Sequence, residues 1–268
     1  MKVVSLDLDT EDLAQTYERV SAERQYKSGQ RLLQYLEVME GESVLDIGCG
    51  TGLLAESIAA IVGPHGLVVG IDPLALRIEI AKRRTRSNLT YSTGNAYDLS
   101  EFSPDTFDVV YMNAVFHWLP EKREPLRQII RVLKKGGRLG ISSGSRNHPN
   151  PIHSIKEQVL SRAPYNQYPP AAESEAQRLS EQELTDLLTQ AGFAMKTMET
   201  YLDVQHQMPA EAALRFAEAS SFGNFLGNLP EELRASARED ILRELEQTGP
   251  LVSTTRDRFR IVAIAVKP

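Results

Sequence analysis

The stretch Val44–Gly52, VLDIGCGTG, constrains this chain more than any other. It is an apolar run that ends in an acid and continues into glycines at alternate positions, Gly48, Gly50 and Gly52. Glycine adopts positive φ without steric cost and leaves the backbone open to close approach by a ligand. The next residues, LLAESIAAIV, have helical periodicity and stop at Gly63, as is typical of a helix C-terminus. The pattern predicts a buried strand, a tight turn and a helix that together bind a cofactor.

Two acids beside these glycines favour a cationic ligand. Asp46 ends the predicted strand, where a carboxylate would repel a pyrophosphate and attract an ammonium or sulfonium group. Asp72 ends the next apolar run, LVVGID, twenty positions beyond Gly52, where a carboxylate is placed to accept hydrogen bonds from ribose hydroxyls. An ordinary turn acid at Asp46 and a helix cap at Asp72 are the alternatives. Together with the glycine turn, the acids predict a positively charged adenosyl ligand.

A nicotinamide dinucleotide site is the second interpretation of the same turn. The dinucleotide fingerprint requires Gly-x-Gly-x-x-Gly, and Leu53 occupies the position of its third glycine. The match is therefore partial. An oxidoreductase would be favoured by binding of NAD without binding of a cationic adenosyl ligand.

The run Asp46-Ile47-Gly48-Cys49-Gly50-Thr51-Gly52 resembles the first motif of class I S-adenosylmethionine-dependent methyltransferases. The resemblance continues with Asp72 as the ribose acid, with Asn95-Ala96 after a third strand, and with the turn LKKGGRL, residues 133–139, before a fifth. It implies S-adenosyl-L-methionine as the cofactor. The cofactor-binding residues expected on this basis are Asp46, Gly48, Cys49, Gly50, Gly52, Asp72, Pro73, Asn95, Ala96, Asn113 and Tyr17.

The order of predicted elements indicates an α/β fold. From residue 43 the patterns alternate between strand and helix: SVLDI, LLAESIAAIV, LVVGI, ALRIEIAKRR, LTYST, FDVVYM, a helix around PLRQIIRVL, and RLGIS. Such alternation predicts a Rossmann-like, doubly wound, mostly parallel sheet that binds ligands at the carboxyl ends of its strands. The resemblance implies seven strands with the last one antiparallel, the final two lying near 193–204 and 256–266.

We expect a single methyltransferase domain over residues 1–268. Its predicted parts are an N-terminal helical cap (1–40), a cofactor-binding core (41–145), two helical lid insertions (146–192 and 207–250) and the final strands (193–206 and 251–268). Long insertions near the carboxyl ends of strands are usually functional. We therefore expect the insertions to cover the pocket for the methyl acceptor.

The segment MNAVFHWLPEK, residues 112–122, carries Asn113, His117 and Trp118 out of the fourth predicted strand. It resembles the corresponding stretch of trans-aconitate and juvenile-hormone-acid methyltransferases, which make methyl esters of carboxylic acids. The resemblance implies a small-molecule acceptor and O-methylation of a carboxylate or hydroxyl group. N- or C-methylation of a small molecule and a non-catalytic S-adenosylmethionine-binding protein are the alternatives.

His117 and Trp118 are the predicted catalytic-site residues. The sulfonium of the cofactor is already activated, so the protein mainly holds the acceptor in line and excludes water. A carboxylate needs no base, whereas a phenol or amine could use His117, because the unperturbed pKa of histidine is near 6.5. A hydrogen bond to a backbone carbonyl is the alternative for His117, and a core anchor is the alternative for Trp118.

Two further sets of residues are candidates for the site. Tyr17 and Gln25 could close over the cofactor's methionine end, although helical spacing explains Tyr17 equally well as a core residue. An anionic acceptor would need a cation in the lid, and four arginines are available: Arg24, Arg146, Arg178 and Arg215.

Composition narrows the function classes. The net charge of -6 argues against a nucleic-acid partner, which would require clustered basic residues, and Lys82-Arg83-Arg84 is interpreted as a solvated helix end. The lone Cys49 excludes an internal disulfide and a multi-thiolate metal site, so no metal is predicted and arsenic methylation is disfavoured. Neither a signal peptide nor a membrane span is predicted. A cytoplasmic monomer or homodimer is expected.

Overall fold

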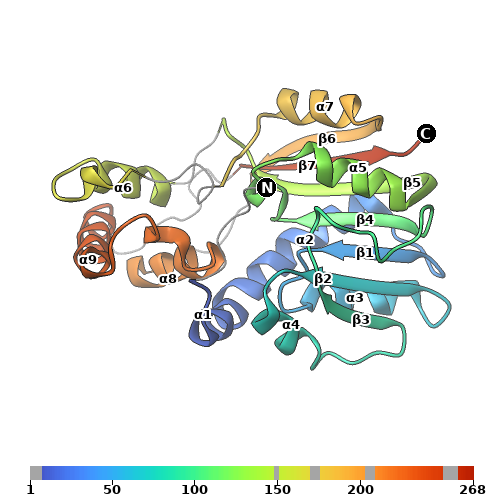
Figure 1. The fold of residues 1–268 in the computed structure, drawn as a ribbon, viewed down its shortest axis with the longest axis horizontal. Helices are drawn as coiled ribbons and strands as arrows, with labels where there is room; N and C mark the ends of the chain where they lie inside the picture. The colour runs from blue at the N-terminus through green and yellow to red at the C-terminus, as the bar shows by residue number, and fades with distance from the viewer. Residues whose placement is uncertain (1–7, 148–150, 170–175, 203–208, 250–258) are drawn as a thin grey trace.

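The computed structural model describes residues 8–147, 151–169, 176–202, 209–249 and 259–268 (Figure 1). Within these residues, seven strands form one sheet in the order β3-β2-β1-β4-β5-β7-β6. They are β1 (Ser43–Ile47), β2 (Leu67–Asp72), β3 (Leu89–Thr93), β4 (Phe107–Asn113), β5 (Leu133–Gly144), β6 (Ala194–Leu202) and β7 (Phe259–Val266). Among these strands, β7 runs antiparallel to both of its neighbours, β5 and β6, and every other neighbouring pair is parallel. The predicted Rossmann-like sheet with an antiparallel last strand is confirmed.

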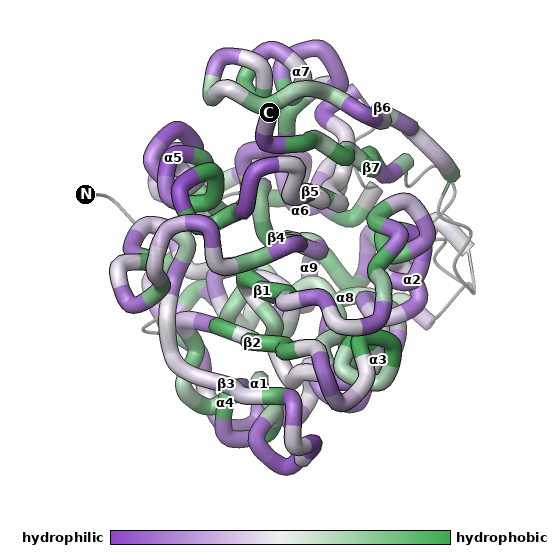
Figure 2. Tube along the Cα trace, turned by 90° about the vertical axis from the view of Figure 1, so that its right-hand side faces the viewer, coloured by the Kyte–Doolittle hydropathy of each residue, from purple (hydrophilic) through white to green (hydrophobic). Residues whose placement is uncertain are grey.

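Helices cover both faces of this sheet. One face packs against α2 (Glu23–Leu36) and α3 (Leu53–Val62), and the other against α5 (Arg123–Val132) and α7 (Glu181–Gln190). Strand β1 alternates between these layers, because Val44 joins the first cluster and Leu45 the second. Figure 2 shows the hydrophobic stretches gathered along the central strands β1, β2 and β7. These two cores hold the carboxyl ends of the strands in fixed positions.

The helical insertions pack together beyond the carboxyl ends of the strands. Helices α6 (Pro151–Leu160), α8 (Ala210–Ser220) and α9 (Glu231–Gln247) share a third apolar cluster. In Figure 1 these helices lie together to the left of the sheet, with α1 (Glu11–Thr16) below them. We call α6, α8, α9 and the turn 221–223 the lid.

The glycine turn has the predicted conformation. Gly48, Gly50 and Gly52 have φ of 78°, 56° and 82°, so all three lie in the left-handed region that favours glycine. The helix α3 begins directly after Gly52 and ends at Val62, before Gly63. A capping box formed by Ser180 and Glu183 begins α7.

One local prediction was wrong, and a second holds only in part. The expected turn at 133–139 lies within β5, because the register passes from Phe107 opposite Leu133 to Val109 opposite Arg138 through a bulge at Gly136. Backbone bonds with Lys267 satisfy this bulge. In the basic run after α4 (Ala75–Ala81), Lys82 and Arg83 are exposed as predicted, whereas Arg84 is only partly exposed and forms ion pairs with Glu18 and Glu56.

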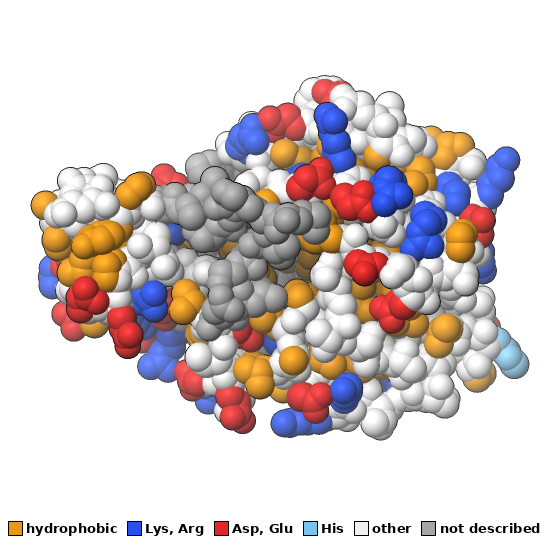
Figure 3. All heavy atoms as spheres, viewed as in Figure 1, with side chains coloured by type: hydrophobic (Ala, Val, Ile, Leu, Met, Phe, Trp, Pro, Cys, Tyr) orange, Lys and Arg blue, Asp and Glu red, His pale blue; other side chains and the backbone are white. Residues whose placement is uncertain are grey.

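Residues 11–36 are helical, but they do not form one regular helix. Between α1 and α2 the chain forms a π-helical stretch, η1 (Tyr17–Ala22). On the face seen in Figure 3, acidic and basic side chains are interspersed. Within the described ranges, none of the helices has both the length and the apolar character needed to cross a bilayer.

Candidate active site

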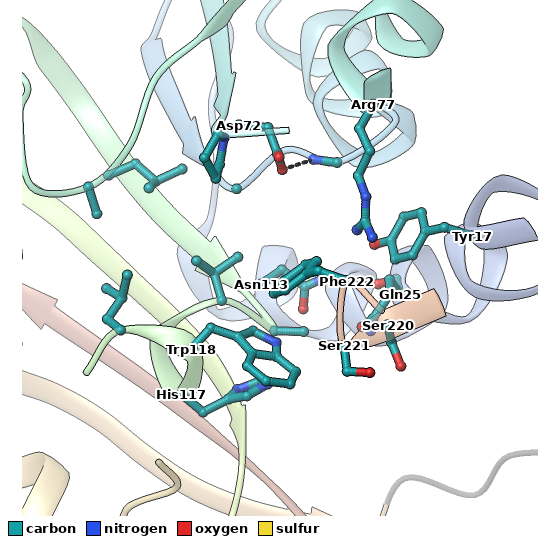
Figure 4. A pocket seen from close by; sticks show the side chains of 18 of the residues that line it. Tyr17, Gln25, Asp72, Arg77, Asn113, His117, Trp118, Ser220, Ser221 and Phe222 are labelled. Atoms are coloured by element: carbon teal, nitrogen blue, oxygen red, sulfur yellow. Dashed lines mark hydrogen bonds between the residues drawn. The ribbon is translucent and has the colours of Figure 1, made fainter. Parts of the chain in front are cut away.

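A cavity of about 260 Å³ lies between the carboxyl ends of the strands and the lid. Figure 4 shows side chains from both sides pointing into it. The predicted site residues that line it are Tyr17, Gly48, Gly50, Asp72, Pro73, Asn95, Ala96, Asn113, His117 and Trp118. The predicted residues Asp46 and Cys49 line an adjoining cleft of about 30 Å³, which shares Tyr17, Gln25, Gly48 and Asn113 with the cavity. The remaining predicted site residue, Gly52, lies at the start of α3.

Asp72 joins the glycine turn to the end of β2. Its carboxylate accepts hydrogen bonds from the backbone N–H of Gly50 at 2.8 Å, the dashed line in Figure 4, and from that of Leu74 at 2.9 Å. The side chain is buried, and this burial raises the pKa of Asp72, while Arg77 opposes the rise. Asp72 therefore braces the turn and the start of α4 while lining the cavity.

Asp46 lies behind the glycine turn, on the side of β1 that faces α2 and α3. Its carboxylate accepts a 2.5 Å hydrogen bond from the hydroxyl of Tyr111. Burial raises the pKa of Asp46 to about 8, against the lowering effect of Tyr111, and nearby Asp72 adds to the rise. The structure thus buries two carboxyl groups near the turn. Burial also raises the pKa of the Cys49 thiol, which keeps the thiol protonated.

The loop after β3 lines the cavity through Asn95, Ala96 and Tyr97. Asn95 closes the loop by accepting a hydrogen bond from the backbone N–H of Tyr97 at 2.9 Å. Tyr97 was not among the predicted residues, although it follows the predicted pair directly. Its aromatic side chain, two positions after Asn95, was the available signal.

The N-terminal segment closes over the glycine turn. A Cβ atom at Gly50 would lie 3.3 Å from the ring of Tyr17, so the two groups face each other closely. Asn113 at the end of β4 donates to the backbone carbonyl of Gln25 at 2.8 Å. The Oδ1 atom of Asn113 is buried and has no hydrogen-bond partner in the described structure. Burial raises the pKa of Tyr17 to about 12, so its hydroxyl stays protonated.

The other end of the cavity contains His117 and Trp118, which lie on the turn after β4. The ring of His117 is buried, and its Nδ1 lies 3.1 Å from the hydroxyl oxygen of Ser143. Trp118 is partly exposed and lines the cavity, and its ring centroid lies 5.4 Å from that of His117. The geometry therefore favours Trp118 as part of the cavity wall rather than as an anchor in the core.

Of the four candidate arginines, Arg178 lines the cavity. Its Nη2 atom lies 3.2 Å from Nε2 of His153 in α6. Arg146 and Arg215 form exposed ion pairs with Glu183 and Glu211, and the side chain of Arg24 lies outside the described residues.

Sequence reasoning missed Arg77 and Phe222, which both line the cavity. Arg77 is only 2% exposed and comes from the core helix α4, whereas Phe222 follows the lid helix α8. Phe222 has a φ of 58°, a conformation that costs a non-glycine residue on the order of 1 kcal/mol. Arg77 follows Asp72 by five positions in an ordinary amphipathic helix, so only the tertiary structure reveals that it meets the lid.

Comparison with known proteins assigns the family. The family described as "Methyltransferase domain" matches residues 39–192, more than half of the chain. The chain belongs to this family. It is an S-adenosylmethionine-dependent methyltransferase, which confirms the predicted class of enzyme and its cofactor. The absence of the third glycine of the dinucleotide fingerprint, whose position Leu53 occupies, agrees with this outcome.

The relatives of this methyltransferase act on different acceptors. It is 27% identical to trans-aconitate 2-methyltransferase of Variovorax paradoxus over 88% of this chain and 89% of the relative. It is 32% identical to arsenite methyltransferase of Mus musculus over 54% of this chain and 42% of that relative. It is 39% identical to demethylmenaquinone methyltransferase of Symbiobacterium thermophilum over 37% of this chain and 41% of the relative. The chain thus spans less than half the length of the last two.

Solved structures share the fold of this methyltransferase. One neighbour comes from the Haloferax volcanii complex between the Trm112 methyltransferase activator and a methyltransferase, with a TM-score of 0.63, 20% identity and 95% coverage of both chains. The [4+2]-cyclase SpnF has a TM-score of 0.60 and 18% identity, with 91% of this chain and 81% of that chain covered. At these identities the likeness concerns the fold alone.

Proposed function

We propose that this methyltransferase transfers the methyl group of S-adenosylmethionine to an oxygen atom of a small-molecule acceptor, a carboxylate or a hydroxyl. The observation that carries the proposal is one continuous cavity. It runs from Asp72 and the glycine turn to His117 and Trp118 beneath the lid. A concave site that combines apolar and aromatic walls with a few polar groups suits a small molecule.

The residues around the turn fit the cofactor. We infer that Asp72 accepts hydrogen bonds from the ribose hydroxyls, that Pro73, Asn95 and Ala96 flank the base, and that the glycine backbone lies against the nucleoside. Asp46 is a buried carboxyl group whose described hydrogen-bond partner, the Tyr111 hydroxyl, is neutral. A cationic ligand would supply the positively charged partner that the ionised Asp46 carboxylate lacks.

The methionine end of the cofactor has its own candidate contacts. Tyr17, Gln25 and Asn113 line both the cavity and the adjoining cleft that holds Asp46. The Oδ1 atom of Asn113 is buried without a hydrogen-bond partner in the described part of the chain, so it can accept one from an ammonium group. We infer that these residues hold the amino-acid portion near Asp46.

Catalysis in this proposal is mainly positioning. The bound cofactor supplies a methyl group that is already activated towards a nucleophile. The wall at Trp118 and the lid hold the acceptor in line and exclude water, an effect that can reach roughly 7–11 kcal/mol. The Ser143 hydroxyl orients the ring of His117. His117 can accept the proton of a hydroxyl acceptor, whereas a carboxylate is already ionised.

Two observations support an oxygen acceptor that carries negative charge. The trans-aconitate methyltransferase relative is matched over nearly its whole length. In addition, Arg178 and His153 line the end of the cavity that holds Trp118. The arsenite methyltransferase likeness covers a smaller part, and the lone Cys49 disfavours a thiolate-bound arsenic substrate.

An acceptor screen tests the proposal. The protein would be incubated with S-adenosylmethionine and separate panels of small carboxylic acids, phenols and amines, with the demethylated product and methylated acceptor measured by mass spectrometry. We expect turnover in the carboxylic-acid panel, giving methyl esters that alkali hydrolyses. N-methylated products, or turnover in none of the panels by protein that binds the cofactor, would contradict the proposal.

The variant His117→Gln distinguishes the two oxygen acceptors. With a carboxylate, kcat should stay within a few-fold of the wild type, because no proton has to be removed. With a phenol, kcat should fall by about 100-fold or more if His117 is the base.

A further inference from the structure

The guanidinium of Arg77 lies where the core, the N-terminal segment and the lid meet. Its Nη2 donates to the backbone carbonyl of Ala219 in α8 at 2.9 Å. Its Cζ lies 4.0 Å from the ring centroid of Tyr17 and 5.0 Å from that of Phe222. Figure 4 shows the guanidinium beside the ring of Tyr17. Arg77 thus links three segments that are far apart in sequence.

Phe222 continues this contact towards the acceptor end. Its ring centroid lies 5.1 Å from that of Trp118, in an edge-to-face arrangement. The left-handed backbone of Phe222 is followed by Gly223, where a Cβ atom would lie 2.5 Å from the carbonyl oxygen of Leu8. The N-terminal segment therefore packs closely on this turn. A bulky residue in a strained backbone conformation at such a position is typical of a functional constraint.

Together these side chains form a row across the cavity, in the order Tyr17, Arg77, Phe222 and Trp118. Tyr17 faces the glycine turn, and Trp118 borders the opposite end. A guanidinium is planar and stacks on aromatic rings, so a shift of Arg77 is passed to the rings on either side. Phe222 is the member that touches both Arg77 and Trp118.

A ligand beside Asp72 would meet this row directly. Arg77 and Asp72 line the same cavity. The Nε atom of Arg77 and the Oδ1 atom of Asp9 are buried without hydrogen-bond partners in the described structure, and Asp9 Oδ1 lies 4.0 Å from Nη2 of Arg77. Arg77, which lines the cavity, therefore has unused hydrogen-bonding capacity that a polar ligand can engage, which would change the position of the guanidinium.

We propose that Arg77 and Phe222 are positioning residues that couple occupation of the cofactor end of the cavity to the shape of its acceptor end. The inference rests on the proposed function in one respect, because it takes the Trp118 end as the acceptor site. Coupling itself requires only the cofactor, so it can be measured without an acceptor.

Trp118 supplies the measurement, since it is the only tryptophan in the sequence. S-adenosylhomocysteine, the demethylated cofactor, would be titrated into the wild-type protein while binding is followed by calorimetry and by tryptophan emission. We expect the emission to change with the same Kd that calorimetry gives. Binding without any change in emission would overturn the proposal.

Two variants test the row itself. Arg77→Met keeps the length of the side chain but removes the guanidinium, and we expect a Kd several-fold higher with no emission change at saturation. Phe222→Leu keeps Arg77, so the Kd should stay within about twofold while the emission change is again lost. If either folded variant retains the full wild-type change at saturation, the coupling is refuted. Should Arg77→Met fail to fold by circular dichroism, Phe222→Leu alone decides.

Arg238→Met is the matched control. Arg238 braces α8 against α9 through ion pairs with Glu211 at 2.7 Å and Glu218 at 2.9 Å, and it does not line the described cavity. Loss of this brace should leave both the Kd and the emission change at the wild-type values. Equal loss of the emission change in this control would overturn the assignment to Arg77. No binding to the wild-type protein would instead refute the cofactor site itself, so the two failures are distinguishable.

Discussion

Replacing Asp46 by asparagine should remove a pH-dependent part of cofactor affinity. Burial raises the pKa of Asp46 to about 8, from an ordinary value of 3.8. The carboxyl group of the cofactor-free protein is therefore mostly protonated at pH 7. A cation bound beside it selects the ionised form, so binding at pH 7 carries a deprotonation cost on the order of 1 kcal/mol that disappears well above pH 8.

Asparagine has nearly the same shape and can still accept the hydrogen bond from Tyr111, but it cannot ionise. The ratio of the variant's Kd to the wild-type Kd for S-adenosylmethionine should therefore rise about tenfold between pH 7 and pH 9. The free energy of unfolding of the wild type should, in contrast, fall as the pH rises. A pKa raised by folding lowers the wild-type free energy of unfolding as the pH rises from about 4 to about 8, and the variant lacks this loss. At pH 8 the variant should be at least as stable as the wild type.

Calorimetric titrations from pH 6.5 to pH 9 would give the Kd values, and thermal unfolding at each pH would give the stability. Taking the ratio between two proteins cancels the titration of the ligand itself. A ratio that stays constant over this range would refute the role of Asp46 as the partner of a cation. If Asp46→Asn were much less stable than the wild type at pH 8, the claim that Asp46 is a buried carboxyl group without a charged partner would be refuted.

Three further predictions concern the turn, the cavity wall and the core. Gly52→Ala should lower the free energy of unfolding by about 2–3 kcal/mol, because its Cβ would lie 2.4 Å from the hydroxyl of Tyr91. The control Gly41→Ala has the same φ of 82° but open space around the new Cβ, so it should cost only about 1 kcal/mol. Equal losses for the two variants in urea unfolding would contradict the clash with Tyr91. Trp118→Leu should raise the acceptor KM about tenfold while the Kd for S-adenosylhomocysteine stays within twofold, and an unchanged KM in steady-state kinetics would remove Trp118 from the acceptor wall. Glu42→Gln should lower the free energy of unfolding by about 2–3 kcal/mol, since Glu42 accepts two 2.7 Å hydrogen bonds from the largely buried Arg138. The control Lys196→Met breaks an exposed ion pair with Glu37 and should not shift the unfolding midpoint. Equal shifts of the midpoint would contradict the stronger effect expected for the buried pair.

The features that the sequence predicted well are those with local causes. Three glycines at alternate positions after an apolar run permit a turn with positive φ at no steric cost, and the observed φ values agree with this. The alternation of strand and helix patterns implied the parallel sheet, and ligand sites in such sheets lie at the carboxyl ends. For this reason most of the predicted site residues came together in one cavity.

The features that the sequence did not predict depend on contacts between distant segments. Arg77 has the spacing of an ordinary helical residue, and its partner Ala219 lies 142 positions further along the chain. Phe222 adopts positive φ in a turn where Gly223 packs closely against Leu8, a contact that no local preference indicates. Arg84 was expected in solvent, yet the π-helical stretch brings Glu18 within 2.5 Å of it. The bulge in β5 likewise depends on Lys267 at the far end of the chain.

A crystal structure of the protein with S-adenosylhomocysteine bound would test the central claim most directly. The account predicts that the ribose hydroxyls lie within hydrogen-bond distance of the Asp72 carboxylate, that the amino group lies beside Asp46, and that the sulfur points towards Trp118 beneath the lid. A nucleoside bound away from the glycine turn, or one whose sulfur points away from the cavity under the lid, would contradict it.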